Sequence, residues 1–416
     1  MNSMKKMAGL GAALMFCLGG TAAADEYHYT NILIGDRASG MGGAHTAVSD
    51  EPSGLYYNPA GIAYARTSNL SASVNAYNAT HTTYKNALGG SHDWTRSSSS
   101  LLPNFFGIVQ PLGNGVIGFS YAVPDTIIED QDQVFGNFPS ALPGIDVTSY
   151  TINFNQNDST YKFGPSYAQD INEQWSWGIT LYYHYRDLQR IQNEYVILSD
   201  GRRQWTNSYL QSSEHGFQPI LGLMWSPTQR LAVGLTLSQT LISSSTTTAQ
   251  LAQESITGTS TPPTQYRTGD KREFPMQLRL GVAYFQSDRL LLAADIIHNQ
   301  AYDYDYAGGK VKREAVTDIA LGVEYYLTGT WALRGGFYTS YANTPDIGST
   351  AVNYEEHVDF IGFTGSISRY TRNSSLTFGL GYGIGSGQAQ LFANTTNRQD
   401  VDSTALTAFL STSYSY

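Results

Sequence analysis

The stretch WSWGITLYYHYR, residues 175–186, alternates strictly between two kinds of side chain. One face carries Trp, Ile, Leu and Tyr side chains, whereas the other carries mostly small or polar ones. A period of two is typical of a β-strand with one apolar face. The same pattern recurs in residues 231–238, 276–285 and 376–384, so the sequence predicts an all-β protein.

Strand-like segments of this kind recur along the whole chain after residue 68. About fourteen can be traced, and they begin near residues 69, 102, 115, 160, 174, 214, 229, 272, 289, 314, 331, 356, 375 and 404. Short connections such as PLGNG and QSDR alternate with long polar ones, including residues 124–158, 199–212 and 243–270. This alternation is typical of an outer-membrane barrel with short periplasmic turns and long extracellular loops. We therefore predict an antiparallel β-barrel of about 14 strands over residues 68–416.

Both ends of the chain agree with export to the bacterial outer membrane. Residues 1–24 combine Lys5 and Lys6 with an apolar run and the small residues AAA, which predicts a signal peptide. The final stretch TALTAFLSTSYSY alternates and ends on Tyr416. A terminal strand that ends in an aromatic residue is what the barrel assembly machinery recognises, so we expect that machinery as a partner during biogenesis.

Composition excludes several classes of function. The formal net charge is −10, which argues against nucleic acid as a partner because no basic stripe could release counterions. Cys17 is the only cysteine and lies in the predicted signal peptide, which rules out disulfides and thiolate metal sites. No nucleophile motif or zinc-type histidine spacing occurs, and the acidic stretch DYDYDY lacks a full set of calcium ligands. We therefore expect no enzyme activity, no cofactor and no metal site.

Residues 25–67 precede the first strand and are rich in glycine and small side chains. A barrel of this size has a lumen that something must fill or leave open. We predict that this segment is a compact hatch inside the lumen. Its motif GDRASGMGGAHTAVSDEPSGLYYNPAGIA, residues 35–63, resembles the N-terminal hatch of the FadL-type transporters of long-chain fatty acids and aromatic hydrocarbons.

The resemblance implies a fourteen-stranded barrel that works as a monomer in the outer membrane, in contact with lipid and lipopolysaccharide. It also implies that Asn58, Pro59 and Ala60 abut a kinked strand beside a lateral opening, where they have a gating role. Hydrophobic molecules would bind first in an outer groove, then in a pocket within the barrel, and leave sideways. A plain Asn-Pro turn is the alternative reading of these three residues.

Candidate substrate-binding residues follow from the alternation. Arg186, Arg279 and Arg334 are predicted to point into the lumen, where an arginine fork suits a carboxylate head group. Alternatively, these arginines pair with acidic residues and hold the hatch in place. Phe135 and Phe138 lie in an unusually apolar part of the predicted 124–158 loop, which is either a docking groove or packs into the barrel mouth.

A second role fits the same motif. PorV-type proteins, which act as shuttles or anchors for secreted proteins, have a similar MGGA and YYNPAG segment on a FadL-like barrel. A side opening beside the hatch would favour transport of small molecules. A large apolar extracellular groove would favour a protein partner, and an open lumen would favour a diffusion porin.

Overall fold

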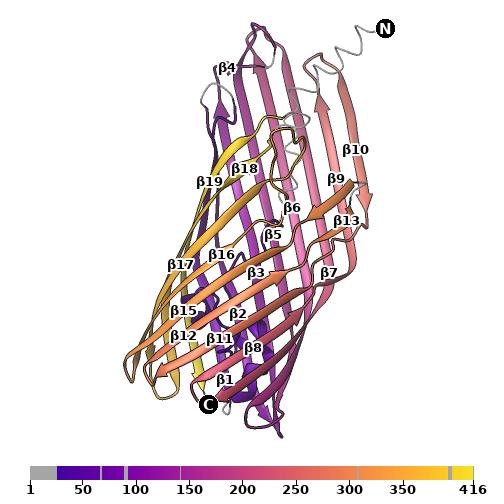
Figure 1. Ribbon diagram of the computed structural model, residues 1–416. Helices are drawn as coiled ribbons and strands as arrows, with labels where there is room; N and C mark the ends of the chain where they lie inside the picture. Colours follow the sequence, from indigo (N-terminus) through magenta and orange to yellow (C-terminus); the bar gives the residue numbers. More distant parts are fainter. Residues whose placement is uncertain are drawn as a thin grey trace.

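The computed structural model describes residues 26–65, 68–88, 92–140, 142–306, 309–391 and 396–415, and it is a closed antiparallel β-barrel of 14 strands (Figure 1). The predicted signal peptide lies outside the described residues. Each of the fourteen predicted strands corresponds to one barrel strand. The barrel strands are β1 (Asn69–Tyr84), β2 (Trp94–Leu112), β3 (Gly115–Phe135), β5 (Asp146–Asp170), β6 (Trp175–Leu198), β7 (Arg203–Thr228), β8 (Leu231–Ser238), β11 (Gln277–Ser287), β12 (Leu290–Asn299), β15 (Val316–Thr328), β16 (Trp331–Ser340), β17 (His357–Tyr370), β18 (Ser374–Ala389) and β19 (Gln399–Ser415).

The barrel closes between its first and last strands. β1 pairs with β19 from Asn69 opposite Ser415 to Tyr84 opposite Val401, and β1 also pairs with β2. Closure matters because a backbone N–H or C=O at an unpaired edge costs several kcal/mol in hydrocarbon, on the order of the penalty for burying any unpaired polar group.

Apolar side chains form a belt around the outside of the barrel. In β6, Trp177, Ile179 and Leu181 are exposed, whereas the alternate residues are buried toward the lumen. Aromatic side chains border the belt, with Trp175 stacked on Trp225 at the end with short turns. The eleven residues from Trp175 to Tyr185 match the span that a tilted strand needs to cross a bilayer, about 9–11 residues. The protein is therefore an integral outer-membrane barrel.

Several predicted loops are instead regular β-structure, and this part of the prediction is wrong. β3 and β5 occupy most of residues 124–158, and β7 begins at Arg203 within the predicted loop 199–212. The predicted loop 243–270 contains β9 (Leu241–Glu254) and β10 (Ser260–Thr268), which extend the wall above β7 (Figure 1). Above the membrane the outward face of these strands carries polar side chains in place of the apolar belt, so the pattern of the membrane-spanning strands does not continue. The remaining short strands are β4 (Phe138–Pro139), β13 (Tyr302–Tyr306) and β14 (Gly309–Arg313).

The N-terminal segment, residues 26–65, lies inside the barrel (Figure 1). It contains the short helices α2 (Asp36–Gly40) and α3 (Gly54–Tyr57) and the 3-10 helix η2 (Pro59–Tyr64). Wall glycines make room for it: a Cβ on Gly322 would lie 2.8 Å from the Met41 side chain, and one on Gly178 would lie 2.5 Å from Pro59. No helix among the described residues is long and apolar enough to cross a membrane.

Candidate functional site

Asn58, Pro59 and Ala60 link the N-terminal segment to the wall. The Asn58 side-chain oxygen accepts a hydrogen bond from the Ala60 N–H, which caps η2 as an Asn-Pro turn should. Its Nδ2 donates to the carbonyl oxygens of Thr46 at 2.8 Å and of Leu223 in β7 at 3.2 Å. Asn58 is therefore both a turn residue and a clamp on the barrel wall.

A second link uses buried charge. Glu324 in β15 accepts hydrogen bonds from Arg37 of α2 at 2.8 Å and from Arg334 of β16 at 2.6 Å. Arg334 also donates to the hydroxyl groups of Ser368 and Tyr370. Of the two readings of Arg334, the geometry matches the one in which it pairs with an acid and holds the N-terminal segment.

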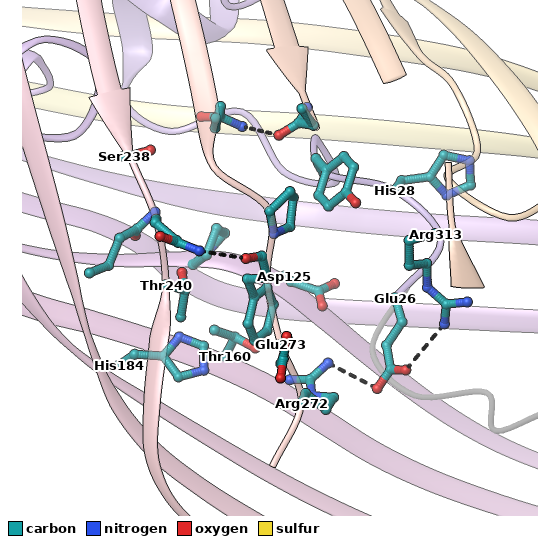
Figure 2. Close-up of a pocket in the computed structure, with 18 of the residues that line it drawn as sticks. Glu26, His28, Asp125, Thr160, His184, Ser238, Thr240, Arg272, Glu273 and Arg313 are labelled. Atoms are coloured by element: carbon teal, nitrogen blue, oxygen red, sulfur yellow. Dashed lines mark hydrogen bonds and ion pairs between the residues drawn. The ribbon is translucent and has the colours of Figure 1, made fainter. Parts of the chain in front are cut away.

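Arg186 is part of an ion cluster around Glu26. The Arg186 guanidinium donates to Asp158 at 2.6 and 2.8 Å and to Glu26 at 3.0 Å. Arg272 pairs with Glu26 at 2.9 Å and with Glu214 at 2.7 Å. Figure 2 shows Glu26 between Arg272 and Arg313. The Arg313 guanidinium lies 4.0 Å from the Glu26 carboxylate. The carboxylate of Glu26, the first described residue, therefore anchors this end of the segment in the lumen.

A cavity of about 140 Å³ lies beside this cluster (Figure 2). Residues of the N-terminal segment line it together with side chains from β3, β5, β6, β11 and the 272–275 connection. Its volume is comparable with the roughly 150 Å³ that holds benzene in an engineered cavity. Tyr29, Tyr56, Phe274, Tyr302 and Tyr304 give the lining its aromatic character.

Two cations in this cavity have no ion-pair partner among the described residues. Arg279 is 9% exposed, donates only to the side chain of Gln277, and packs over the ring of Tyr57 at 5.3 Å. Lys162 is equally buried, and its ammonium lies 5.9 Å from the ring centre of Tyr56. Asp125, in the wall of the same cavity, attracts it from beyond ion-pair distance. A buried cation favours a counter-charge strongly, so this part of the cavity suits an anionic group.

The barrel wall is interrupted next to the cavity. The β2–β3 ladder runs from Leu112 opposite Gly115 only as far as Phe105 opposite Ala122. There the pairing of β3 with β5 also slips by one residue, between Ala122 and Asp125, at the position of Pro124. Proline has no N–H to donate to a ladder, which explains why the bulge lies here.

The N-terminal segment covers this seam from inside. The Ile32 N–H donates to the Pro124 carbonyl at 3.1 Å, and the Asn104 side chain of β2 donates to the Leu33 carbonyl at 3.0 Å. Further out, the seam is bridged by side chains, with Arg96 paired to Glu129 at 2.6 Å. Residues 32–33 therefore replace the missing backbone ladder between the two strands.

Phe135 and Phe138 lie far from the cavity, at the extracellular end of the barrel. Phe138 is 5% exposed and belongs to a buried cluster with Trp94, Tyr150 and Val196, and Phe135 packs against it. This arrangement matches the reading in which these side chains pack into the barrel mouth. The predicted acidic stretch forms a hairpin of β13 and β14, in which Asp303 pairs with Lys310 at 3.1 Å.

The sequence did not point to several residues of the site. Glu26, Asp125, Arg272 and Arg313 all line the cavity, but none of them was predicted to be functional. Arg272 lies outside the regular strands, so alternation could not assign it a face. The bulge had one available signal, because Pro124 interrupts an otherwise regular strand pattern.

Comparison with known proteins gives no match to any protein-family profile or curated sequence. Solved structures do match. The Pseudomonas putida toluene transporter TodX has a TM-score of 0.66 at 16% identity, covering 92% of this chain and 98% of its own. The CymD monoaromatic hydrocarbon channel has a TM-score of 0.60 at 14% identity, covering 92% and 97%. A Pseudomonas aeruginosa FadL homologue has a TM-score of 0.61 at 15% identity, covering 93% and 99%. The chain therefore has the fold of the FadL-type outer-membrane transporters, which are channels and not enzymes.

Proposed function

We propose that this protein is an outer-membrane channel that takes up hydrophobic small molecules, with a preference for those that carry a carboxylate. The observation that supports this most directly is the cavity in the lumen with Arg279 and Lys162 in its wall. Its aromatic side chains provide apolar surface for a ring or alkyl chain, and the two cations provide a counter-charge for a head group.

The exit route that we propose is lateral, through the seam between β2 and β3. The cavity and the seam share Pro124, so a molecule in the cavity is already next to the break in the wall. A sideways route moves a hydrophobic molecule between two apolar environments and avoids a water-filled pore. In this proposal the N-terminal segment acts as a hatch, and its residues 32–33 must move aside before the molecule leaves.

The alternative role as an anchor for secreted proteins would use an apolar groove on the extracellular surface. At this end, Phe138 and Tyr150 belong to a buried cluster of apolar side chains, so they do not form such a groove. We therefore develop the transport role, with the barrel acting as a monomer.

Removing the bulge tests the exit route. Two residues of β3, Val123 and Pro124, stand opposite one residue of β5, so deletion of Pro124 alone restores a regular register on both sides. The β2–β3 ladder can then extend and close the seam. In cells that lack their own outer-membrane fatty acid transporter, we expect the parent protein to take up labelled oleate and the deletion to abolish uptake.

Pro124→Ala is the matched control, because it changes the same residue but keeps the bulge. We expect it to retain most of the uptake. Heat-modifiable migration of the surface-exposed protein would show that each variant is a folded barrel. Equal uptake by the parent and the deletion, with both folded, would exclude the seam as the exit.

A further inference from the structure

The strands β3, β5, β6 and β7 are among the longest of the barrel, and together with β9 they form a wall that extends beyond the apolar belt (Figure 1). The outer border of the apolar belt is marked by a row of neighbouring rings, Tyr121, Tyr161, Tyr185 and His215, whose centres are 6.4, 6.0 and 5.1 Å apart. Beyond it β6 runs on to Leu198. At about 3.3 Å per residue, these thirteen residues add about 40 Å of strand above the hydrocarbon region.

The outward side of this extension can be followed strand by strand. The ladder between β6 and β7 is unbroken from Trp175 opposite Trp225 to Ile197 opposite Arg203. Odd-numbered residues of β6 therefore keep facing outward above the membrane, as they do in the belt. The same face continues into β5 on one side and β9 on the other.

Amide side chains form a row across this face. Asn153, Asn193 and Asn207 lie opposite one another on β5, β6 and β7. Asn207 donates its amide to the Asn193 oxygen, and Asn153 donates to Asp132 of β3 at 2.7 Å. Each amide has two donors and two acceptor positions, so every one keeps capacity for an outside partner.

Two large aromatic rings occupy the next outward positions of β6 and β7, beyond the amide row. Tyr195 lies opposite Trp205, and the indole N–H of Trp205 donates to Glu254 at 3.0 Å, which fixes the ring. A shallow hollow of about 470 Å³ lies over these rings and over Asn153, Asn193 and Asn207. The hollow therefore combines flat apolar rings with a line of hydrogen-bonding groups.

The charge on this face limits the occupant. The outward positions considered are those of β6 from Asp187 to Tyr195 and the positions opposite them in β3, β5, β7 and β9. Among these described residues there are four acidic ones, Asp130, Asp132, Asp187 and Glu254, and no lysine or arginine. A phosphate or an acidic polymer would be repelled. The amides make the face too polar to bury against lipid chains, where each unpaired group is costly.

We propose that this face binds the neutral sugar units of the glycolipid in the outer leaflet. Sugar hydroxyl groups donate and accept, as side-chain amides do, and the apolar C–H face of a sugar ring packs on an aromatic ring. The face is continuous with the membrane belt through Tyr185 and Tyr183. A glycolipid anchored beside the belt therefore carries its saccharide directly to the hollow, so little entropy is lost in bringing the two together.

Titration of the purified barrel, freed of lipopolysaccharide, with a defined probe tests the proposal. The probe is the oligosaccharide released from lipopolysaccharide by acid hydrolysis and then stripped of phosphate. We expect millimolar binding by the parent and a loss of at least tenfold in Asn193→Ala/Asn207→Ala and in Tyr195→Ala/Trp205→Ala. The control Gln253→Ala/Tyr266→Ala removes an amide and a ring from the opposite face of the same extension, and we expect it to bind like the parent.

Three outcomes would overturn the proposal. The first is no binding of the stripped oligosaccharide by the folded parent barrel. The second is equal binding by the parent and by both variants of the hollow. The third is binding that requires phosphate on the sugar together with a divalent cation, because that would assign recognition to the acidic residues instead of the amides and rings.

Discussion

Replacing Arg279 separates the contribution of charge from that of apolar contact in the cavity. Arg279→Met keeps a long side chain beside Tyr57 but removes the guanidinium. No carboxylate lies within ion-pair distance of Arg279 among the described residues. The buried Asp295, which Arg279 attracts at longer range, keeps its hydrogen bonds from His45 and Thr46 after the change. We therefore expect the barrel to fold and the effect to fall on the ligand.

The magnitude follows from the burial of the group. A hydrogen bond to a charged partner contributes about 1.5–3 kcal/mol, which corresponds to roughly 10- to 150-fold in affinity. Arg279 is 9% exposed, so solvent screens little of this interaction. We expect the Kd for 4-phenylbutyrate to rise within that range in Arg279→Met. The Kd for 4-phenylbutanol, which has the same skeleton without the charge, should change by less than about threefold.

Calorimetric titration of the purified proteins in detergent measures both values. Arg369→Met is a suitable control, because Arg369 also packs over an aromatic ring, that of Trp331 at 5.6 Å, but lies on the outside of the wall. It should bind both ligands like the parent. A loss of affinity in Arg279→Met that is equal for the acid and the alcohol would refute the argument from charge.

Two further predictions concern the attachment of the N-terminal segment. Asn58→Ala leaves the carbonyl groups of Thr46 and Leu223 without their donor, which should destabilise the attachment by about 2–4 kcal/mol and raise leakage of small hydrophilic solutes, measured by liposome swelling. Unchanged leakage would show that the clamp is dispensable. Glu26→Gln removes a carboxylate shared by several arginines, whereas Asp158 and Glu214 still pair with Arg186 and Arg272. Amide hydrogen exchange of residues 27–33 should therefore become at least tenfold faster. The midpoint of thermal unfolding of the barrel should not change. Exchange that stays slow would place the anchor elsewhere.

The sequence was a good guide where burial and exposure alternate with a period of two. In β6 and β11 this alternation predicted both the strands and the lumen-facing arginines. It failed above the membrane, where Asn153, Asn155 and Asn157 face outward and the inward positions change from Phe154 to Gln156 and Asp158, so the apolar contrast is too short to stand out. Polarity of this kind predicts a loop, although the backbone pairing is complete.

The sequence could also not decide which arginines are paired. Arg186, Arg279 and Arg334 have the same local pattern and all lie in the lumen. Neighbouring strands supply Glu324 to Arg334 and Asp158 to Arg186, but other members of each cluster come from far away in the chain. Glu26 lies 160 residues from Arg186, and Arg37, which shares Glu324 with Arg334, lies 287 residues from that carboxylate. Local patterns carry no information about such contacts, so the distinction that matters for ligand binding came only from the fold.

The N-terminal segment connects the cavity to the seam. Glu26, His28, Tyr29 and Asn31 line the cavity, and Ile32, the next residue along, closes the seam through Pro124. A ligand too bulky for this cavity of about 140 Å³ can be accommodated by displacing part of the lining. Such displacement strains the Ile32 hydrogen bond, because one short continuous stretch, residues 26–32, makes both contacts. Ligand binding is then coupled to opening of the seam, because the ligand binds more tightly when the seam is open. A bulky ligand therefore shifts the equilibrium toward the open seam more than a small ligand does. We therefore expect the Pro124 deletion, which closes the seam, to weaken binding of oleate more than binding of 4-phenylbutyrate.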